Sequence, residues 1–137
     1  MKNAVRGIVA LAGLAVFGVA QASNWIVIRE TSNPQLSIDA QSIRKLADGS
    51  VTVWVQQRYP APKTLANGAA YTYFMAHNRF FCQNRQLSMG EIHWYAANGA
   101  SVKTDLDDGT VRDVAPDSTA EFLLDLACGA AAKLSSN

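Results

Sequence analysis

An export signal followed by two cysteines, Cys82 and Cys128, constrains this chain more than any other feature of its sequence. Residues 1–22 contain a short basic start, a continuous apolar run and then Ala20-Gln21-Ala22, the small-x-small pattern after which signal peptidase cuts. We therefore predict a signal peptide over residues 1–22 and a mature chain that begins at Ser23. Export would place both cysteines in an oxidising compartment.

A pair of cysteines in a small exported domain usually forms a disulfide. A bond between Cys82 and Cys128 would close a long loop and contribute roughly 4 kcal/mol by the chain-entropy argument. It would fasten the end of a predicted helix to a predicted strand. The pair has no C-x-x-C spacing, which favours a structural over a redox role.

The mature chain, residues 23–137, is predicted to be one domain, with residues 130–137 as a frayed tail. It has no cysteine at the cleavage site, so we expect no lipid anchor. No apolar run after residue 22 approaches the roughly 20 residues of a membrane span. These features predict a soluble periplasmic or secreted protein, with an uncleaved N-terminal anchor as the alternative.

Charge argues against nucleic acid as a partner. Once the two basic residues of the signal are removed, ten Lys and Arg remain against eleven Asp and Glu. The mature chain therefore has a net charge of −1, and it shows no basic stripe of the kind that binds phosphate backbones.

The first half of the mature chain predicts strands separated by turns. Valines at 51, 53 and 55 alternate with polar or aromatic residues, which is typical of a strand with one buried face. Pro60 is expected to end this strand, because proline cannot continue a hydrogen-bonded ladder. Asp39 is suited to cap one helical turn over residues 39–44, and Asp48-Gly49 predicts a hairpin turn. The expected strands are residues 24–29, 36–39 and 50–59.

The second half predicts further strands and then a helix. The apolar parity of one strand switches at Gly90, which predicts a bulge, and Asn98-Gly99 predicts a hairpin turn. Ser118 and Glu121 form a capping box at the start of a helix, and Gly129 suits the position just past its end. The expected strands are residues 69–83, 87–97 and 101–106. The predicted fold class is α+β, an antiparallel meander sheet of about five to seven strands with a C-terminal helix packed on one face.

Catalytic and metal-binding patterns are weak in this sequence. His77 and His93 have no second ligand at metal-site spacing, and the chain has no nucleophile elbow and no phosphate loop. The acidic segment 105–109 lacks the spacing of a calcium loop and predicts a solvated hairpin turn. We expect no cofactor and no enzyme activity. The enzyme alternative would require Asp39, His77 or His93 to converge in a pocket.

Aromatic residues and histidines on the predicted strands suggest a binding surface. Side chains along a strand alternate between the two faces of the sheet, so these residues can line one face together. An exposed aromatic face is a candidate for partner binding. The alternative is that they cover the core or the sheet edge. The candidate face, opposite the helix, comprises Tyr71, Tyr73, His77, His93 and Tyr95.

The order of several landmarks resembles the surface-adhesin protein E family, small exported domains of Gram-negative bacteria. The matching landmarks are Trp25, Asp39, Ser42, Trp54, Cys82, Pro116, Ser118 and Cys128. The resemblance implies a sheet with a C-terminal helix joined by the disulfide. It also implies an adhesin that binds host extracellular-matrix proteins and can form a homodimer. This chain departs from the family by its missing lipid-anchor cysteine and by Val111, where the family pattern places tryptophan.

These observations favour an exported, non-enzymatic domain that binds a protein partner, with host matrix proteins and envelope proteins as the expected partners. The runner-up hypothesis is a periplasmic inhibitor or stress-protective protein similar to lysozyme inhibitors. A small β-domain with one disulfide suits that role, although the sequence contains no loop that specifies inhibition.

Overall fold

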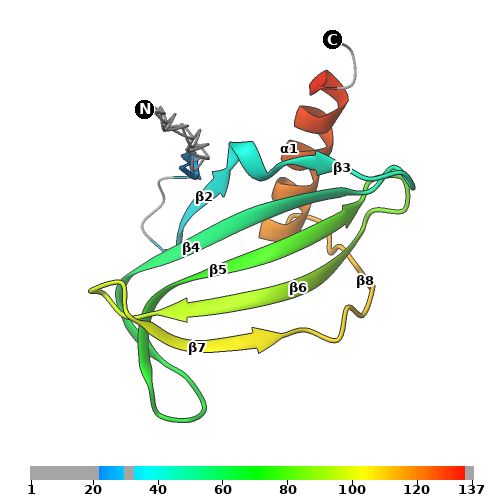
Figure 1. The fold of residues 1–137 in the computed structure, drawn as a ribbon. Coiled ribbons are helices and arrows are strands. Elements are labelled where there is room, and N and C mark those ends of the chain that lie inside the picture. Colours follow the sequence, from blue (N-terminus) through cyan, green and yellow to red (C-terminus); the bar gives the residue numbers. More distant parts are fainter. Residues whose placement is uncertain (1–21, 30–32, 135–137) are drawn as a thin grey trace, which may run out of the picture.

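The computed structural model describes residues 22–29 and 33–134, so all of the predicted signal peptide except Ala22 lies outside the described residues. The described chain forms an antiparallel sheet with one long helix behind it (Figure 1). The main path of the sheet runs in the order β1-β2-β4-β5-β6-β7, while β3 pairs with β4 and β8 pairs with β6. The meander and the α+β class are confirmed. The strands are β1 (Trp25–Arg29), β2 (Gln35–Asp39), β3 (Arg44–Lys45), β4 (Val51–Thr64), β5 (Ala70–Phe81), β6 (Gln86–Tyr95), β7 (Ser101–Leu106) and β8 (Arg112–Asp113); the helices are the 3₁₀ turn η1 (Ala40–Ser42) and α1 (Thr119–Leu134).

The core lies between the sheet and α1. Side chains alternate along a strand, so every second residue of β4 and β5 points towards the helix. Phe80 is 0% exposed at the centre of this layer. Burial of one sheet face by one helix is what gives this short chain a single hydrophobic core. The core residues are Leu36, Ile38, Ile43, Val51, Val53, Val55, Phe80, Leu123, Leu124, Ala127 and Ala131.

Strand β4 is longer than predicted, because Pro60 does not end it. The strand continues through Pro60 and Pro62 to Thr64. Its pairing with β2 stops at Arg58, so beyond that point β4 pairs only with β5, and the β4–β5 register shifts between Arg58 and Lys63. Proline is tolerated at such an edge and at a bulge, because its missing N–H is not needed there.

The capping box of α1 forms as predicted at its first turn. Ser118 Oγ accepts a hydrogen bond from Glu121 N at 3.1 Å, and Glu121 Oε2 accepts one from Asp117 N at 2.8 Å. These bonds satisfy two backbone N–H groups near the helix start.

Gly129 does not end α1, and the tail does not fray at Ala130. The helix runs on to Leu134, and Ala131 is only 2% exposed against the sheet. Continued packing on this face outweighs the cost of a helical glycine, which is about 1 kcal/mol. Residues 135–137 lie outside the described part of the chain.

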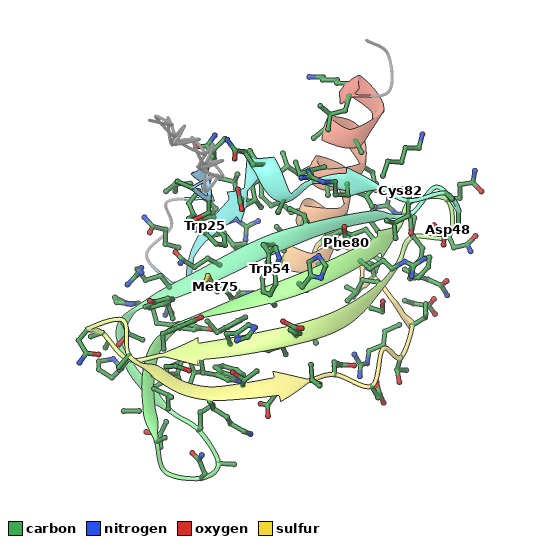
Figure 2. All side chains as sticks on the ribbon, viewed as in Figure 1. Trp25, Asp48, Trp54, Met75, Phe80 and Cys82 are labelled. Atoms are coloured by element: carbon green, nitrogen blue, oxygen red, sulfur yellow. A yellow bond between two sulfur atoms is a disulfide. The ribbon has the colours of Figure 1, made fainter. Side chains whose placement is uncertain are left out.

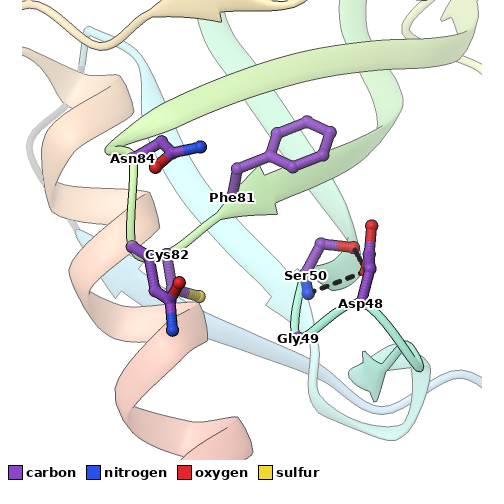
Figure 3. A pocket seen from close by; sticks show the side chains of 7 residues that line it. Asp48, Gly49, Ser50, Phe81, Cys82 and Asn84 are labelled. Carbon is purple, nitrogen blue, oxygen red and sulfur yellow. Dashed lines mark hydrogen bonds between the residues drawn. The ribbon is translucent and has the colours of Figure 1, made fainter.

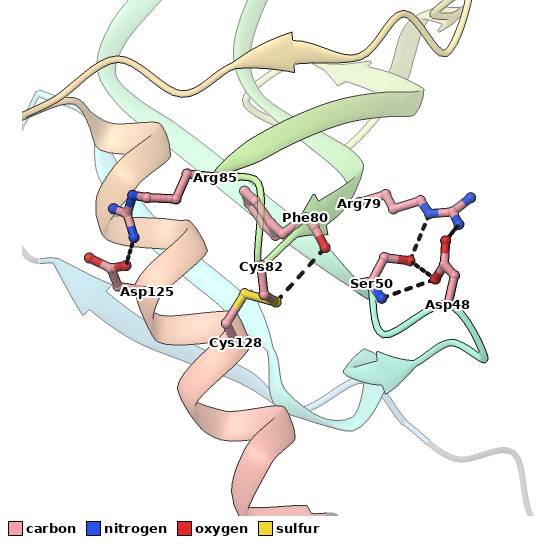
Figure 4. Close-up of a disulfide and its surroundings, with 8 residues drawn as sticks. All are labelled: Asp48, Ser50, Arg79, Phe80, Cys82, Arg85, Asp125 and Cys128. Carbon is pink, nitrogen blue, oxygen red and sulfur yellow. Dashed lines mark hydrogen bonds and ion pairs between the residues drawn. A yellow bond between two sulfur atoms is a disulfide. The ribbon is translucent and has the colours of Figure 1, made fainter.

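The predicted Cys82–Cys128 disulfide is present, with a Cα–Cα distance of 6.0 Å (Figure 4). It joins the residue just after β5 to the middle of α1. Arg85, from the turn between β5 and β6, also reaches α1 through ion pairs with Glu121 at 2.7 Å and Asp125 at 3.0 Å. The helix is therefore held on the sheet by core packing, a covalent bond and surface ion pairs.

Candidate functional site: the open face of the sheet

The sheet has one face turned away from α1, which we call the open face. It carries the residues that alternate with the core residues of β4, β5 and β6. Figure 2 looks onto this face, with Trp25, Trp54 and Met75 in view and α1 passing behind the sheet. Its central residues are Trp54, Gln56 and Arg58 on β4, Tyr73, Met75 and His77 on β5, and His93 and Tyr95 on β6.

A bulge at Gly90 shapes the middle of the open face. Ala76 pairs with Ile92 and Asn78 pairs with Met89, so Gly90 and Glu91 both lie opposite the single residue His77. This confirms the bulge that the parity switch predicted. A Cβ on Gly90 would meet the His77 carbonyl oxygen at 3.4 Å, a tight contact that favours glycine here. The extra residue keeps Ile92 on the face that carries α1 and His93 on the open face.

The Trp54 ring contacts both histidines of the open face. It is stacked on His77 with centroids 4.9 Å apart and lies 5.7 Å from His93. Burial lowers the pKa of His77, although the nearby Glu91 carboxylate raises it in part. His93 bonds to Thr104 Oγ1 and to Glu91 Oε2, each at 3.1 Å.

A second aromatic group continues the open face. The rings of Tyr73 and Tyr95 are stacked at 4.9 Å, and the Arg58 guanidinium lies 4.1 Å from the Tyr73 ring centroid. Four of the five predicted face residues, Tyr73, His77, His93 and Tyr95, therefore lie together on this face.

Tyr71 does not join them. Its ring contacts Trp94 at 4.8 Å and Tyr59 at 6.0 Å. Trp94 pairs with Phe74, and both belong to the face that carries α1. The register shift in β4 near the β4–β5 hairpin changes the alternation there, which strict strand parity could not anticipate.

The η1 turn fixes the position of Asp39 at the border of the open face. Asp39 Oδ1 caps η1 by accepting from Gln41 N at 3.1 Å, as predicted, and also accepts from Asn24 N at 2.9 Å. Ser42 Oγ donates to the Asp39 carbonyl at 2.7 Å and accepts from Trp54 N at 2.8 Å. Through these two bonds, Ser42 holds the backbone of Asp39 beside the backbone of Trp54.

These contacts surround a shallow hollow of about 350 Å³. Sequence reasoning assigned Trp25, Asp39 and Trp54 to the framework and did not place them with the binding face. Met75 could have been placed on the open face from the sequence, because it alternates in step with Tyr73 and His77. Trp25 could not, because its place in the hollow depends on its tertiary pairing with Asp39. The hollow is lined by Ser23, Trp25, Asp39, Trp54, Met75, His93 and Tyr95.

A second, smaller hollow of about 90 Å³ lies at the opposite end of the sheet, near the β3–β4 turn (Figure 3). Asp48 accepts from Ser50 N at 3.0 Å and from Ser50 Oγ at 2.6 Å, and it pairs with Arg79. The Ser50 bonds, aided by Arg79, hold the pKa of Asp48 at about 2. These contacts of the Asp48 carboxylate stabilise the β3–β4 turn.

Asp39, His77 and His93 do gather around Trp54, as the enzyme alternative requires. Within residues 22–29 and 33–134, no hydrogen bond joins any two of these three side chains. The same residues contain no cluster of three or more potential metal ligands. No helix in the described part of the chain has the length and apolar character needed to cross a bilayer.

The fold and the open face define a disulfide-bonded α+β domain that presents one aromatic sheet face away from its helix. The chain belongs to the surface-adhesin protein E family, whose sequence pattern matches residues 25–129. It is thus an adhesin-like protein, in agreement with the resemblance of its landmarks. No curated protein matches the sequence.

Solved structures with a similar fold come from Haemophilus influenzae. The structure of its protein E is similar with a TM-score of 0.58 at 14% identity, over 82% of this chain and 89% of that chain. A second crystal form of protein E gives 0.56 at 16% identity, over 79% and 89%. Protein E from the non-typeable organism gives 0.53 at 16% identity, over 87% and 92%. At these identities the likeness establishes the fold.

Proposed function

We propose that this chain is an exported, non-enzymatic domain that binds a protein partner through the open face of its sheet. The observation that carries the proposal is the gathering of Trp54, Tyr73, His77 and Tyr95 on a face that α1 does not cover. Half-buried tryptophan and tyrosine side chains offer large, rigid contact area and are enriched among residues that dominate binding energy. Membership of an adhesin family supports the same function.

The proposed partners are host extracellular-matrix proteins, with envelope proteins as the second group. In this proposal the signal peptide is cleaved after Ala22 and the product is soluble in the periplasm or secreted. A disulfide between Cys82 and Cys128 agrees with an oxidising compartment. Matrix proteins are reached only if the mature protein leaves the periplasm, so surface protease accessibility decides between the two partner groups.

The open face can be tested by a pair of matched aromatic variants. We expect Trp54→Ala to weaken binding of the captured partner at least tenfold, because truncation of a central interface aromatic commonly costs about 2 kcal/mol or more. Phe122→Ala is the control, since Phe122 is 37% exposed on α1, away from the open face. Affinities are measured by surface plasmon resonance at physiological salt, after confirming that both variants melt cooperatively.

Two outcomes would contradict the proposal. One is a loss of affinity for Phe122→Ala with normal binding by Trp54→Ala. The other is the absence of any saturable partner among matrix proteins and envelope extracts. Inhibition of a lysozyme by the wild type, unaffected by Trp54→Ala, would replace the proposal with the inhibitor hypothesis.

A further inference from the structure

The hollow on the open face has a composition that the rest of the face lacks. Trp25, Trp54 and Tyr95 contribute aromatic rings, and Asp39 contributes a carboxylate to the same lining. Aromatic faces carry negative quadrupole potential and attract cations. A carboxylate beside them adds direct charge attraction, which is stronger in a partly desolvated hollow than in water.

The Asp39 carboxylate is held in place but keeps one oxygen for a ligand. Its bonds to Asn24 N and Gln41 N both end on Oδ1. These backbone contacts fix the orientation of the carboxyl group, while no hydrogen bond within the described chain uses Oδ2. A preorganised acceptor of this kind loses little entropy when a ligand binds.

The charged side chains around the hollow also favour a cation. Its lining contains no Lys or Arg side chain. Arg58, the cation on the neighbouring row, lies over the Tyr73 ring at 4.1 Å. On the other side, Glu91 adds a second carboxylate, which contacts His93 at 3.1 Å. Among the described residues, Asp39 is therefore the one Asp, Glu, Lys or Arg side chain of the lining, and a mature terminus at Ser23 would add its ammonium group beside it.

We propose that this hollow is a subsite for a cationic side chain, lysine or arginine, that projects from the protein partner. The proposal rests on the proposed function and specifies the chemistry of the bound segment. A volume of about 350 Å³ lies at the small end of ligand sites, which span about 300–1,000 Å³, and suits one side chain rather than a folded element. The aromatic rings contact the aliphatic stem and the charged head, while Asp39 Oδ2 accepts a hydrogen bond from the ammonium or guanidinium.

The test uses small probes, so it does not depend on identifying the partner. N-acetyl-lysine methylamide and N-acetyl-arginine methylamide are titrated into the mature chain, and the indole N–H signals of Trp25 and Trp54 are followed by NMR. N-acetyl-norleucine methylamide, which has a similar stem and no charge, is the neutral comparison. Ser23 lines the hollow, so all proteins begin at Ser23 and share the same terminal ammonium.

Asp39→Asn removes the charge and keeps an Oδ1 acceptor for the two backbone bonds. We expect both cationic probes to shift the Trp25 and Trp54 signals saturably, and Asp39→Asn to weaken their binding about tenfold. Asp125→Asn on α1 is the control and should bind as the wild type does. If Asp39→Asn fails to fold, Trp25→Leu, which keeps bulk but removes the ring, should show the same loss.

Equal binding of the norleucine probe would overturn the proposal, since it would show an apolar hollow without cation preference. Unchanged affinity of well-folded Asp39→Asn would also overturn it, as would a failure of both cationic probes to shift the two tryptophans. None of these results removes partner binding by the open face, which Trp54→Ala tests separately. Conversely, cation binding by a protein that captures no partner would leave the subsite in place and reject the proposed function.

Discussion

Replacing both Cys82 and Cys128 with serine is expected to lower the free energy of unfolding by about 4 kcal/mol. The cross-link spans 46 residues and ties the end of β5 to α1, so it restricts the unfolded chain over a long loop. For a domain of this size, the loss corresponds to a fall in Tm of roughly 15–20 °C. The helix should be affected most, because the links to the sheet that remain are non-covalent, among them side-chain packing, the Arg85 ion pairs and the contacts of Arg29 with Thr119 and Phe122.

Thermal unfolding followed by circular dichroism measures this effect. Wild-type protein in reductant should melt near the double variant, and reductant should not change the Tm of the variant. Equal melting temperatures for oxidised and reduced wild type would show that the disulfide contributes nothing to stability and would contradict the expectation.

Phe80→Ala is expected to cost about 3–5 kcal/mol of stability, the range for deleting a buried aromatic ring. Phe80 of β5 is 0% exposed in the core between the sheet and α1, and the surrounding strands cannot collapse fully into the space it leaves. Phe81→Ala is the matched control, since the next residue of β5 points to the other face and lies beneath Arg79 at 5.0 Å. It should cost much less.

Urea unfolding of the two variants under oxidising conditions provides the comparison. The contrast between adjacent residues of one strand tests the assignment of buried and open faces directly. Similar losses for Phe80→Ala and Phe81→Ala would mean that α1 does not define the buried side of the sheet.

The fold was predictable where local patterns and burial agree. The alternation of valines at 51, 53 and 55 marks one buried face, and all three are buried in the structure. Gly49, at the predicted hairpin turn, has a φ of +82°, a conformation that glycine adopts without a steric penalty. The two cysteines were predicted to join helix and sheet, and they do.

Sequence reasoning failed where tertiary context decides. Pro60 does not end β4, because the strand has lost its β2 neighbour at that point. Gly129 lies inside α1, because Ala131 still packs on the core beyond it. Tyr71 changes face next to a register shift that no local pattern marks.

The candidate site was only partly predictable for the same reason. Strand parity grouped Tyr73 with His77, and the bulge at Gly90 kept His93 on the same face. The hollow, however, depends on Trp25 of β1, Asp39 of β2 and Trp54 of β4, which are brought together by pairing and by Ser42. Residues that are this far apart in sequence share no periodic pattern.

The three tryptophans provide the most direct test of the open face as the binding surface. Trp25 and Trp54 line the hollow on that face, whereas Trp94 lies on the helix-bearing face and donates from Nε1 to Asp105 at 3.1 Å. We would record the indole N–H signals of the mature protein by NMR while adding the captured partner. We expect the Trp25 and Trp54 signals to shift or broaden first, with the Trp94 signal unchanged. A partner that perturbs Trp94 and leaves Trp25 and Trp54 in place would contradict this expectation.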